Sequence, residues 1–176
     1  MITFRVGKEK DASLIGRLHT TSWLDAYRDI LPTDYLQDDL EAERRHHWQK
    51  KMSSLTGDDF VLIAEEGGRA IGFIAVWEMK DGIYDGFIDN LHVLPKEKGK
   101  GIGARMMIVA AERLIALGKN SWFLWVFDQN TDARRFYEKM RGQPADKGIF
   151  HVRGFKIPET RYVWGDLKSM LREVVG

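Results

Sequence analysis

The chain has 176 residues, no cysteine, and 27 basic against 26 acidic residues, for a formal net charge of +1. We expect one domain over residues 1–176, because a chain of this length can bury roughly 70% of its unfolded surface in a single core. The balanced charge argues against nucleic-acid and anionic-membrane partners. The lack of cysteine excludes disulfides and a thiol nucleophile. Without a signal peptide or long apolar run, the chain is typical of a cytoplasmic protein.

The first third of the chain predicts one strand and two helical regions. Residues 2–6 alternate apolar and polar side chains, as a half-buried strand does. Asp11 stands at an N-cap position, and apolar residues then recur at helical spacing until Pro32, which predicts one long or broken helix. The charged stretch over residues 41–52 predicts another helix.

Three strands are expected next. Residues 60–65 and 70–79 are rich in strand-forming side chains and flank a Gly-Gly pair at 67–68, which favours an antiparallel hairpin. A further strand over residues 86–94 ends at Pro95, because proline cannot donate a ladder hydrogen bond.

The last part of the chain predicts helices and strands in alternation. A helix is expected over residues 104–117, a buried strand over 121–127 and a helix over 133–140, followed by strands at 149–152 and 160–164. No repeat or low-complexity linker interrupts this order. The sequence therefore predicts one mixed α/β or α+β domain.

The connection from Pro95 to the helix at residue 104 has the composition of a phosphate-binding turn. Its three alternating glycines are Gly99, Gly101 and Gly103. Glycine leaves backbone N–H groups open to close approach by an anion, and a helix N-terminus carries about half a positive charge. Lys98 and Lys100 would add cationic reach. The alternative is a flexible connection that binds nothing.

Other ligand classes fit this turn less well. A Walker A loop needs Gly-Lys-Ser or Gly-Lys-Thr at its end, which is missing, and the Rossmann pattern is met only in its permissive Gly/Ala form. A nucleotide-binding protein nevertheless stays among the alternatives. His46 and His47 are adjacent on a charged helix and point about 100° apart, so we predict no metal site.

Two segments resemble the GNAT family of N-acetyltransferases. Val93-Leu94-Pro95 followed by the run from Lys98 to Gly103 is similar to the family's Val-x-Pro and Gln/Arg-x-x-Gly-x-Gly/Ala pattern, with lysine in the first place of the run. The segment from Asn130 to Lys139 is similar to the family's Asn-x-x-Ala-x-x-Phe-Tyr-x-Lys block. The segment from Trp23 to Pro32 resembles the branch that includes polyamine acetyltransferases.

This resemblance implies a GNAT-like central, mostly antiparallel twisted sheet flanked by helices. It implies transfer of an acetyl group from acetyl-CoA to a primary amine of a small molecule or peptide, by direct attack of the amine. Backbone groups of one strand would hold the pantetheine arm and the oxyanion. The implied cofactor-binding residues are Leu91, His92, Val93, Lys98, Gly99, Lys100, Gly101, Ile102, Gly103, Asn130 and Tyr137.

The resemblance also implies catalytic roles. Tyr137 would protonate the leaving thiolate, although its place on an apolar helical stripe also suits a core tyrosine. Asp89 is the first candidate and Asp85 the second for handling the amine proton, each with a solvated carboxylate as the alternative. We expect Asp89 to face the same way as Leu91 and away from His92. For Asn130, a helix cap is the alternative.

The acceptor stays open at this stage. A polyamine, an amino acid derivative, an antibiotic amine and a protein N-terminus all fit. Four aromatic residues either line an amine pocket or fill the core, namely Trp23, Tyr27, Tyr35 and Trp48. A homodimer is also open. The alternative to an enzyme is a non-catalytic acyl-CoA-binding sensor module.

Overall fold

The computed structural model describes residues 1–37, 40–80 and 82–176. Its strands form one seven-stranded sheet in the order β1-β2-β3-β4-β5-β7-β6. All neighbours are antiparallel except β4 and β5, which run parallel. The strands are β1 (Ile2–Val6), β2 (Phe60–Glu66), β3 (Arg69–Glu78), β4 (Gly86–Val93), β5 (Trp122–Phe127), β6 (Gln143–Val152) and β7 (Phe155–Trp164). The predicted mixed fold with a mostly antiparallel sheet is confirmed.

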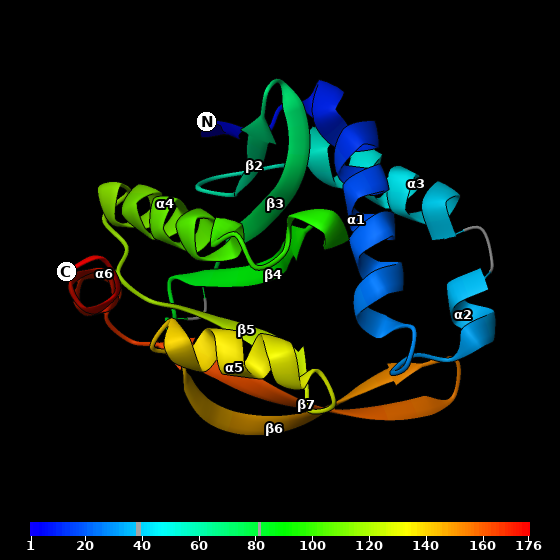
Figure 1. Ribbon diagram of the computed structural model, residues 1–176. Helices are drawn as coiled ribbons and strands as arrows, with labels where there is room; N and C mark the ends of the chain where they lie inside the picture. The colour runs from blue at the N-terminus through cyan, green and yellow to red at the C-terminus, as the bar shows by residue number, and fades with distance from the viewer. Residues whose placement is uncertain (38–39, 81) are drawn as a thin grey trace.

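Helices cover both faces of this sheet (Figure 1). They are α1 (Ala12–Tyr27), α2 (Thr33–Gln37), α3 (Leu40–Ser53), α4 (Ile102–Ala116), α5 (Thr131–Lys139) and α6 (Leu167–Val175), and short 3₁₀ turns precede α1 and α4. One face packs against α1 and α3, and the other against α4, α5 and α6. Within the described ranges, no helix is long and apolar enough to cross a membrane.

Aromatic side chains fill the face under α1 and α3. Trp48 of α3 is fully buried, and its ring lies 5.3 Å from that of Phe73 on β3. The indole Nε1 of Trp48 donates a hydrogen bond to His19 Nδ1 at 2.9 Å, which joins α3 to α1. Trp48 therefore belongs to the core, in agreement with the second of its two sequence interpretations.

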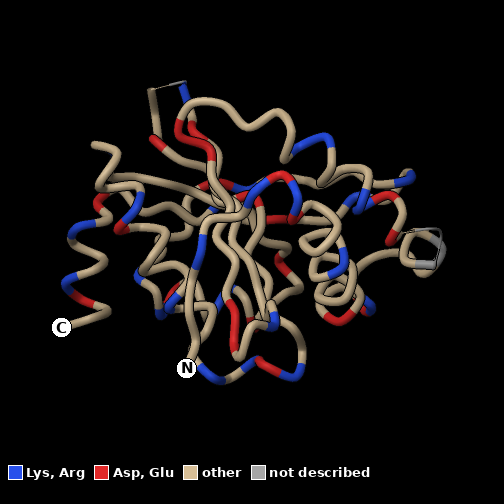
Figure 2. Tube along the Cα trace, turned by 90° about the horizontal axis from the view of Figure 1, so that it is seen from above, with Lys and Arg blue, Asp and Glu red and all other residues tan. Residues whose placement is uncertain are grey.

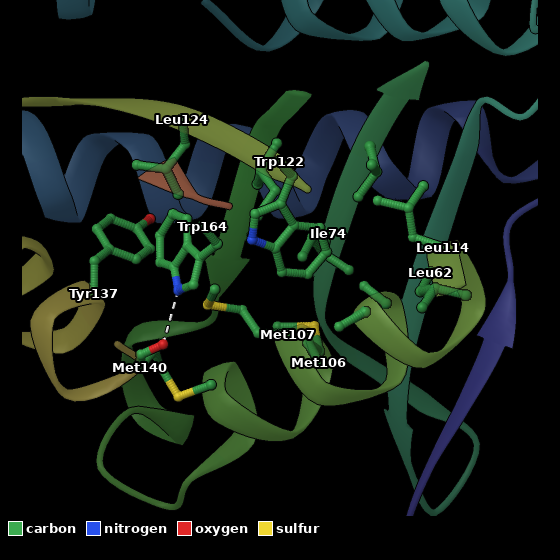
Figure 3. Close-up of a cluster of buried hydrophobic side chains, with 14 of the residues drawn as sticks. Leu62, Ile74, Met106, Met107, Leu114, Trp122, Leu124, Tyr137, Met140 and Trp164 are labelled. Atoms are coloured by element: carbon green, nitrogen blue, oxygen red, sulfur yellow. Dashed lines mark hydrogen bonds between the residues drawn. The ribbon is translucent and has the colours of Figure 1, made fainter. Parts of the chain in front are cut away.

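The opposite face is built on the apolar stripe of α4. Met106, Met107, Ala110, Ala111 and Leu114 have no exposed surface and pack against the sheet, as Figure 3 shows for three of them. The helix expected over residues 104–117 is thus confirmed, and it begins two residues earlier. It ends at Ala116, and Leu117 is 38% exposed.

The parallel contact between β4 and β5 is very short. Gly86 pairs with Trp122 and Phe87 with Phe123, and no pair follows these two in the described part of the chain. Both strands continue, β4 to Val93 and β5 to Phe127. Their facing edges are therefore unpaired beyond Phe87, and the two halves of the sheet diverge there.

A β-bulge in β4 changes the side-chain alternation that the sequence predicts. Asn90 pairs with Ala75 and Ile88 with Val76, so Asp89 is an extra residue without a partner on β3. The expectation that Asp89 faces with Leu91 is wrong. Leu91 packs toward the α4 side, while Asp89 and His92 lie toward α1 and α3.

The C-terminal region has more regular structure than the sequence predicts. The strands β6 and β7 begin six and five residues earlier than the expected strands at 149–152 and 160–164, and α6 was not predicted. After α5 the backbone turns through Arg141 at φ 67°, and Gly142 then passes against the Trp164 ring. A Cβ at Gly142 would lie 2.5 Å from this indole, so a glycine is required at that close approach.

Candidate functional site

The turn between β4 and α4 adopts the conformation that its glycines permit. Gly99 and Gly101 have φ angles of 80° and 74°, which L-residues other than glycine rarely adopt. A Cβ built on either residue would meet no atom within 4 Å. The turn is therefore open to solvent on the side where these side chains would stand.

Six consecutive backbone N–H groups in this turn have no acceptor. They belong to residues 99–104, and none donates a hydrogen bond to the described part of the chain. Such amides at the start of a helix add to the positive end of the helix dipole. The turn therefore has the properties of an anion-binding site.

The lysines of the turn already have carboxylate partners. Lys100 Nζ lies 2.6 Å from Glu97, and Arg69 holds the other carboxylate oxygen of Glu97 at 2.6 Å. Lys98 Nζ pairs with Asp25 of α1 at 2.5 Å. The hydrogen bonds from Lys100 and Arg69 lower the pKa of Glu97, so this side chain stays ionised and fixes the turn. The backbone N–H groups of residues 99–104 are then the donors of the turn that have no partner in the described residues.

The unpaired length of β4 ends at Val93, and the glycine turn follows it in the chain. Leu91, His92 and Val93 all lie on the free length of β4. Ser22 of α1 donates its hydroxyl to the Val93 carbonyl at 3.3 Å. The His92 ring is buried, and this burial, followed by the charge of Arg44, lowers its pKa to about 3, so the ring is neutral at pH 7.

Tyr137 of α5 reaches the place where the two strands part. Figure 3 shows its ring beside Trp164 and Leu124, and Leu124 is the first residue of β5 after the last pair with β4. The side chain is 9% exposed, and its hydroxyl keeps contact with solvent and makes no hydrogen bond within the described residues. Burial, and then the neighbouring Tyr27, raise the pKa of the phenol, so the hydroxyl is protonated at neutral pH.

The two candidate carboxylates occupy different surroundings. One oxygen of Asp85 accepts hydrogen bonds from the backbone N–H groups of Asn120 and Ser121 and from the Ser121 hydroxyl, at 2.8–3.0 Å. These bonds lower the pKa of Asp85 and attach the start of β4 to the start of β5. Asp89, in contrast, is exposed at the bulge and accepts one hydrogen bond from Trp77 Nε1 at 2.9 Å.

Asn130 lies at the start of α5. Its side-chain oxygen accepts a hydrogen bond from the backbone N–H of Ala133 at 3.2 Å. This geometry is that of a helix N-cap, the alternative that the sequence left open. Within the described ranges, no group of three or more His, Asp or Glu side chains is arranged to hold a metal ion.

Comparison with known proteins identifies the family. Residues 20–142 match the acetyltransferase (GNAT) family, which is well over half of the chain. The chain belongs to the GNAT family. The match includes the glycine turn before α4, the divergent strands and α5.

Relatives with a similar sequence carry the same general name. The uncharacterized N-acetyltransferase YuaI of Bacillus subtilis is 29% identical over 174 residues, covering 97% of this chain and 96% of YuaI. An uncharacterized N-acetyltransferase of Archaeoglobus fulgidus is 40% identical over 83 residues, covering 45% and 56%.

Solved GNAT structures share the fold. The PaiA N-acetyltransferase of Thermoplasma acidophilum, in complex with coenzyme A, has a TM-score of 0.72 at 20% identity, covering 93% of this chain and 99% of PaiA. Mutant forms of the spermidine/spermine N-acetyltransferase SpeG of Vibrio cholerae have a TM-score of 0.69 at 15% identity, covering 98% and 99%.

Three polar residues near the divergent strands were not predicted from the sequence. Asn90 follows Asp89 at the bulge and is 7% exposed. Glu159 of β7 pairs with Phe127 at the free end of β5, and its pKa is raised by burial and then by Asp128. The third is Arg44 of α3, whose Nε is buried and has no hydrogen-bond partner in the described residues. Only their neighbours in space distinguish them from ordinary surface residues, so no local sequence signal was present.

Proposed function

We propose that this GNAT protein transfers an acetyl group from acetyl-CoA to a primary amine of a small molecule or peptide. The observation that carries the proposal is the row of six unpaired N–H groups at residues 99–104, next to the point where β4 and β5 separate. The row suits a pyrophosphate, and the gap between two unpaired strand edges suits an extended chain with amide groups. Coenzyme A contains both.

The roles of individual residues follow from this placement. The pyrophosphate binds to the N–H groups from Gly99 to Ala104, with Lys98 and Lys100 at its rim. The pantetheine arm lies along the free edge of β4 at Leu91, His92 and Val93. The thioester then lies near Tyr137, which packs at the start of the gap. Asn130 contributes by holding the N-terminus of α5 in place.

The reaction needs two proton transfers. The amine attacks the thioester carbonyl, a C–N bond forms, the C–S bond breaks, and the leaving thiolate takes a proton. A lysine-like amine has a pKa of about 10.4, so its deprotonation at pH 7 costs about 4.6 kcal/mol. A nearby carboxylate lowers this cost. Tyr137 supplies the proton for the thiolate, because its phenol is protonated and makes no hydrogen bond to another described residue.

Asp89 is the better candidate for accepting the amine proton. It lies at the bulge on the free length of β4 and keeps most of its hydrogen-bonding capacity, since within the described chain it accepts one hydrogen bond, from Trp77. Asp85 is occupied by three hydrogen bonds that fasten β4 to β5. We therefore assign Asp85 a structural role.

Thermal unfolding with ligands tests the cofactor assignment. A ligand at 100 times its Kd stabilises the folded state by about 2.7 kcal/mol, which for a chain of this size raises Tm by roughly 5–10 °C. Acetyl-CoA and CoA should give this shift and ATP should not. Equal shifts with ATP would favour a nucleotide-binding protein, and no shift with any ligand would contradict the proposal.

Turnover separates the enzyme from a sensor module. We expect release of free thiol from acetyl-CoA when amines from a diverse panel are added, and acetylated product by mass spectrometry. Binding of acetyl-CoA without turnover of any amine would instead favour the non-catalytic sensor.

A further inference from the structure

A cluster of polar and aromatic side chains lies between α1, α3 and β4, next to the proposed reaction site. We call it the Arg44 cluster, and its members are His19, Trp23, Arg44, Trp48, Phe73 and His92. His19 is 2% exposed and His92 9% exposed, so the centre of the cluster is nearly closed to solvent. Its polar atoms need partners from the protein or from a ligand.

Arg44 has no carboxylate partner within the described part of the chain. Its guanidinium carbon lies 4.4 Å from the centre of the Trp23 ring, and one Nη donates to the Tyr35 hydroxyl at 3.1 Å. Its Nε is buried and makes no hydrogen bond. Desolvating a charge without pairing it is costly, so an unpaired guanidinium in this position points to an anion that binds there.

Other arginines in the structure differ from Arg44 in their carboxylate partners and in their exposure to solvent. Arg5 and Arg161 are also partly buried, and each pairs with a carboxylate, Asp11 for Arg5 and Asp146 for Arg161. Arg45, the neighbour of Arg44 on α3, is exposed and solvated. Arg44 has neither a carboxylate nor full solvation.

Two further N–H donors in the cluster are also buried and unpaired. Trp48 donates to His19 Nδ1, and burial keeps the pKa of His19 well below its usual range, so this ring is neutral and carries its proton on Nε2. Neither His19 Nε2 nor Trp23 Nε1 has a hydrogen-bond partner in the described residues. The cluster therefore presents three unpaired donors and needs acceptors, which a carboxylate supplies.

The cluster adjoins the reaction site through Tyr27. The Tyr27 ring lies 4.5 Å from that of Trp23 and 5.2 Å from that of Phe127 on the free end of β5. After burial, which is the larger cause, Tyr27 raises the pKa of the Tyr137 phenol. The charge of Arg44 in turn lowers the pKa of Tyr27, which burial raises. A small molecule held by Arg44 thus lies beside the gap where the acetyl group is expected.

We infer that the acceptor is an amine that also carries a carboxylate, and that Arg44 binds this carboxylate. This inference rests on the proposed acetyltransferase function and names its substrate class, an amino acid or a derivative with a free carboxylate. A polyamine is disfavoured, because Arg44 would repel a second ammonium group. The likeness to SpeG is one of fold, at 15% identity.

Matched acceptors test this inference. The common L-amino acids are assayed with acetyl-CoA beside their carboxamides and the amines left by decarboxylation, in the wild type and in Arg44→Gln, Arg44→Lys and Arg45→Gln. For the best carboxylate acceptor, Arg44→Gln should lower kcat/KM by about 10- to 100-fold, the usual range for loss of a hydrogen bond to a charged group. With the matching carboxamide as acceptor, Arg44→Gln should change kcat/KM by less than about threefold.

The other variants separate charge from packing. Arg44→Lys keeps the positive charge and should retain part of the preference for the carboxylate, while Arg45→Gln, with the same charge loss at an exposed site on α3, should match the wild type. Acetyl-CoA affinity by calorimetry should stay constant in all three, which shows that they are folded.

Two results would overturn the inference. The first is that carboxamides or polyamines are acetylated with the same kcat/KM as the carboxylates. The second is that Arg44→Gln lowers kcat/KM equally for all acceptors. In either case Arg44 does not select a carboxylate, although the acetyltransferase proposal stands. If no amine is acetylated while acetyl-CoA binds, the proposed function and the inference fail together.

Discussion

Replacing Tyr137 by phenylalanine removes one hydroxyl and keeps the volume of the ring. In the structure the side chain is 9% exposed, and its hydroxyl keeps contact with solvent and makes no hydrogen bond within the described residues. Removing a hydroxyl of this kind changes stability little, so the free energy of unfolding should change by less than about 0.5 kcal/mol. The expected change in Tm is therefore below roughly 2 °C.

The same substitution should impair catalysis. Loss of a general acid typically lowers the rate by about 10²- to 10⁴-fold, so kcat with the best amine should fall in this range. The Kd for acetyl-CoA should change little, because the phenol contributes to the transition state more than to ground-state binding. Urea unfolding, calorimetry and thiol-release kinetics on the same preparation measure all three quantities.

Tyr162 provides a matched control for this experiment. The Tyr162 side chain is fully buried, and its hydroxyl donates to Glu138 at 2.7 Å and accepts from Arg134 at 3.3 Å. Tyr162→Phe should therefore lose about 1–3 kcal/mol of stability and keep its kcat. If Tyr137→Phe behaves like Tyr162→Phe, the hydroxyl is structural. If it turns over at the wild-type rate, another group protonates the thiolate.

Further predictions concern the turn and the buried histidine. Gly101→Asp should abolish acetyl-CoA binding by calorimetry, because it places strain and a negative charge at the pyrophosphate, whereas Gly118→Asp, at the other end of α4 with φ 81°, should bind normally. Lys98→Ala should weaken binding less than about tenfold, because the N–H groups carry most of the contact. Unfolded histidine titrates near pH 6.5 and folded His92 near 3, so the unfolded chain binds the extra proton between these values and stability rises with pH there. His92 should contribute about 2.5 kcal/mol between pH 4.5 and 7, and His92→Leu should flatten the pH dependence of urea unfolding; an unchanged slope would show that His92 does not titrate this way.

The conformation of the glycine turn before α4 was predictable because its signals are local. Gly99 and Gly101 adopt the positive φ angles that only glycine adopts readily, and both the turn and α4 follow from a few consecutive residues. The hairpin at Gly67 and Gly68 was found for the same reason, and the two residues have φ angles of 57° and 78°. The family resemblance also came from short local runs.

Features that depend on contacts across the sheet were not predictable. The bulge at Asp89 is defined by its pairing with β3, and nothing in the run from Gly86 to Val93 marks an extra residue. Since one residue reverses the alternation, the expected faces of Leu91 and His92 were wrong relative to Asp89. The isolation of Arg44 depends in the same way on which side chains surround it in space.

The missed helix α6 is a different case, because a signal was present. Asp166 accepts a hydrogen bond from the backbone N–H of Ser169 at 3.0 Å, and Leu167 and Met170 are buried one turn apart. An N-cap followed by this spacing predicts a helix. The catalytic roles of Tyr137 and Asp89, the homodimer and the cytoplasmic location stay predictions.

The short pairing of β4 with β5 has a consequence for how the sheet avoids unwanted association. A continuous sheet has edges only at its two outermost strands, here β1 and β6, but this sheet has two more where β4 and β5 separate. Free edges invite other chains to add as strands. These inner edges lie between helices on both faces of the sheet (Figure 1), and residues of both charge signs are interspersed along the chain as a whole (Figure 2). Because helices lie on both faces, a thin, flexible molecule with amide groups suits these inner edges better than a second sheet does.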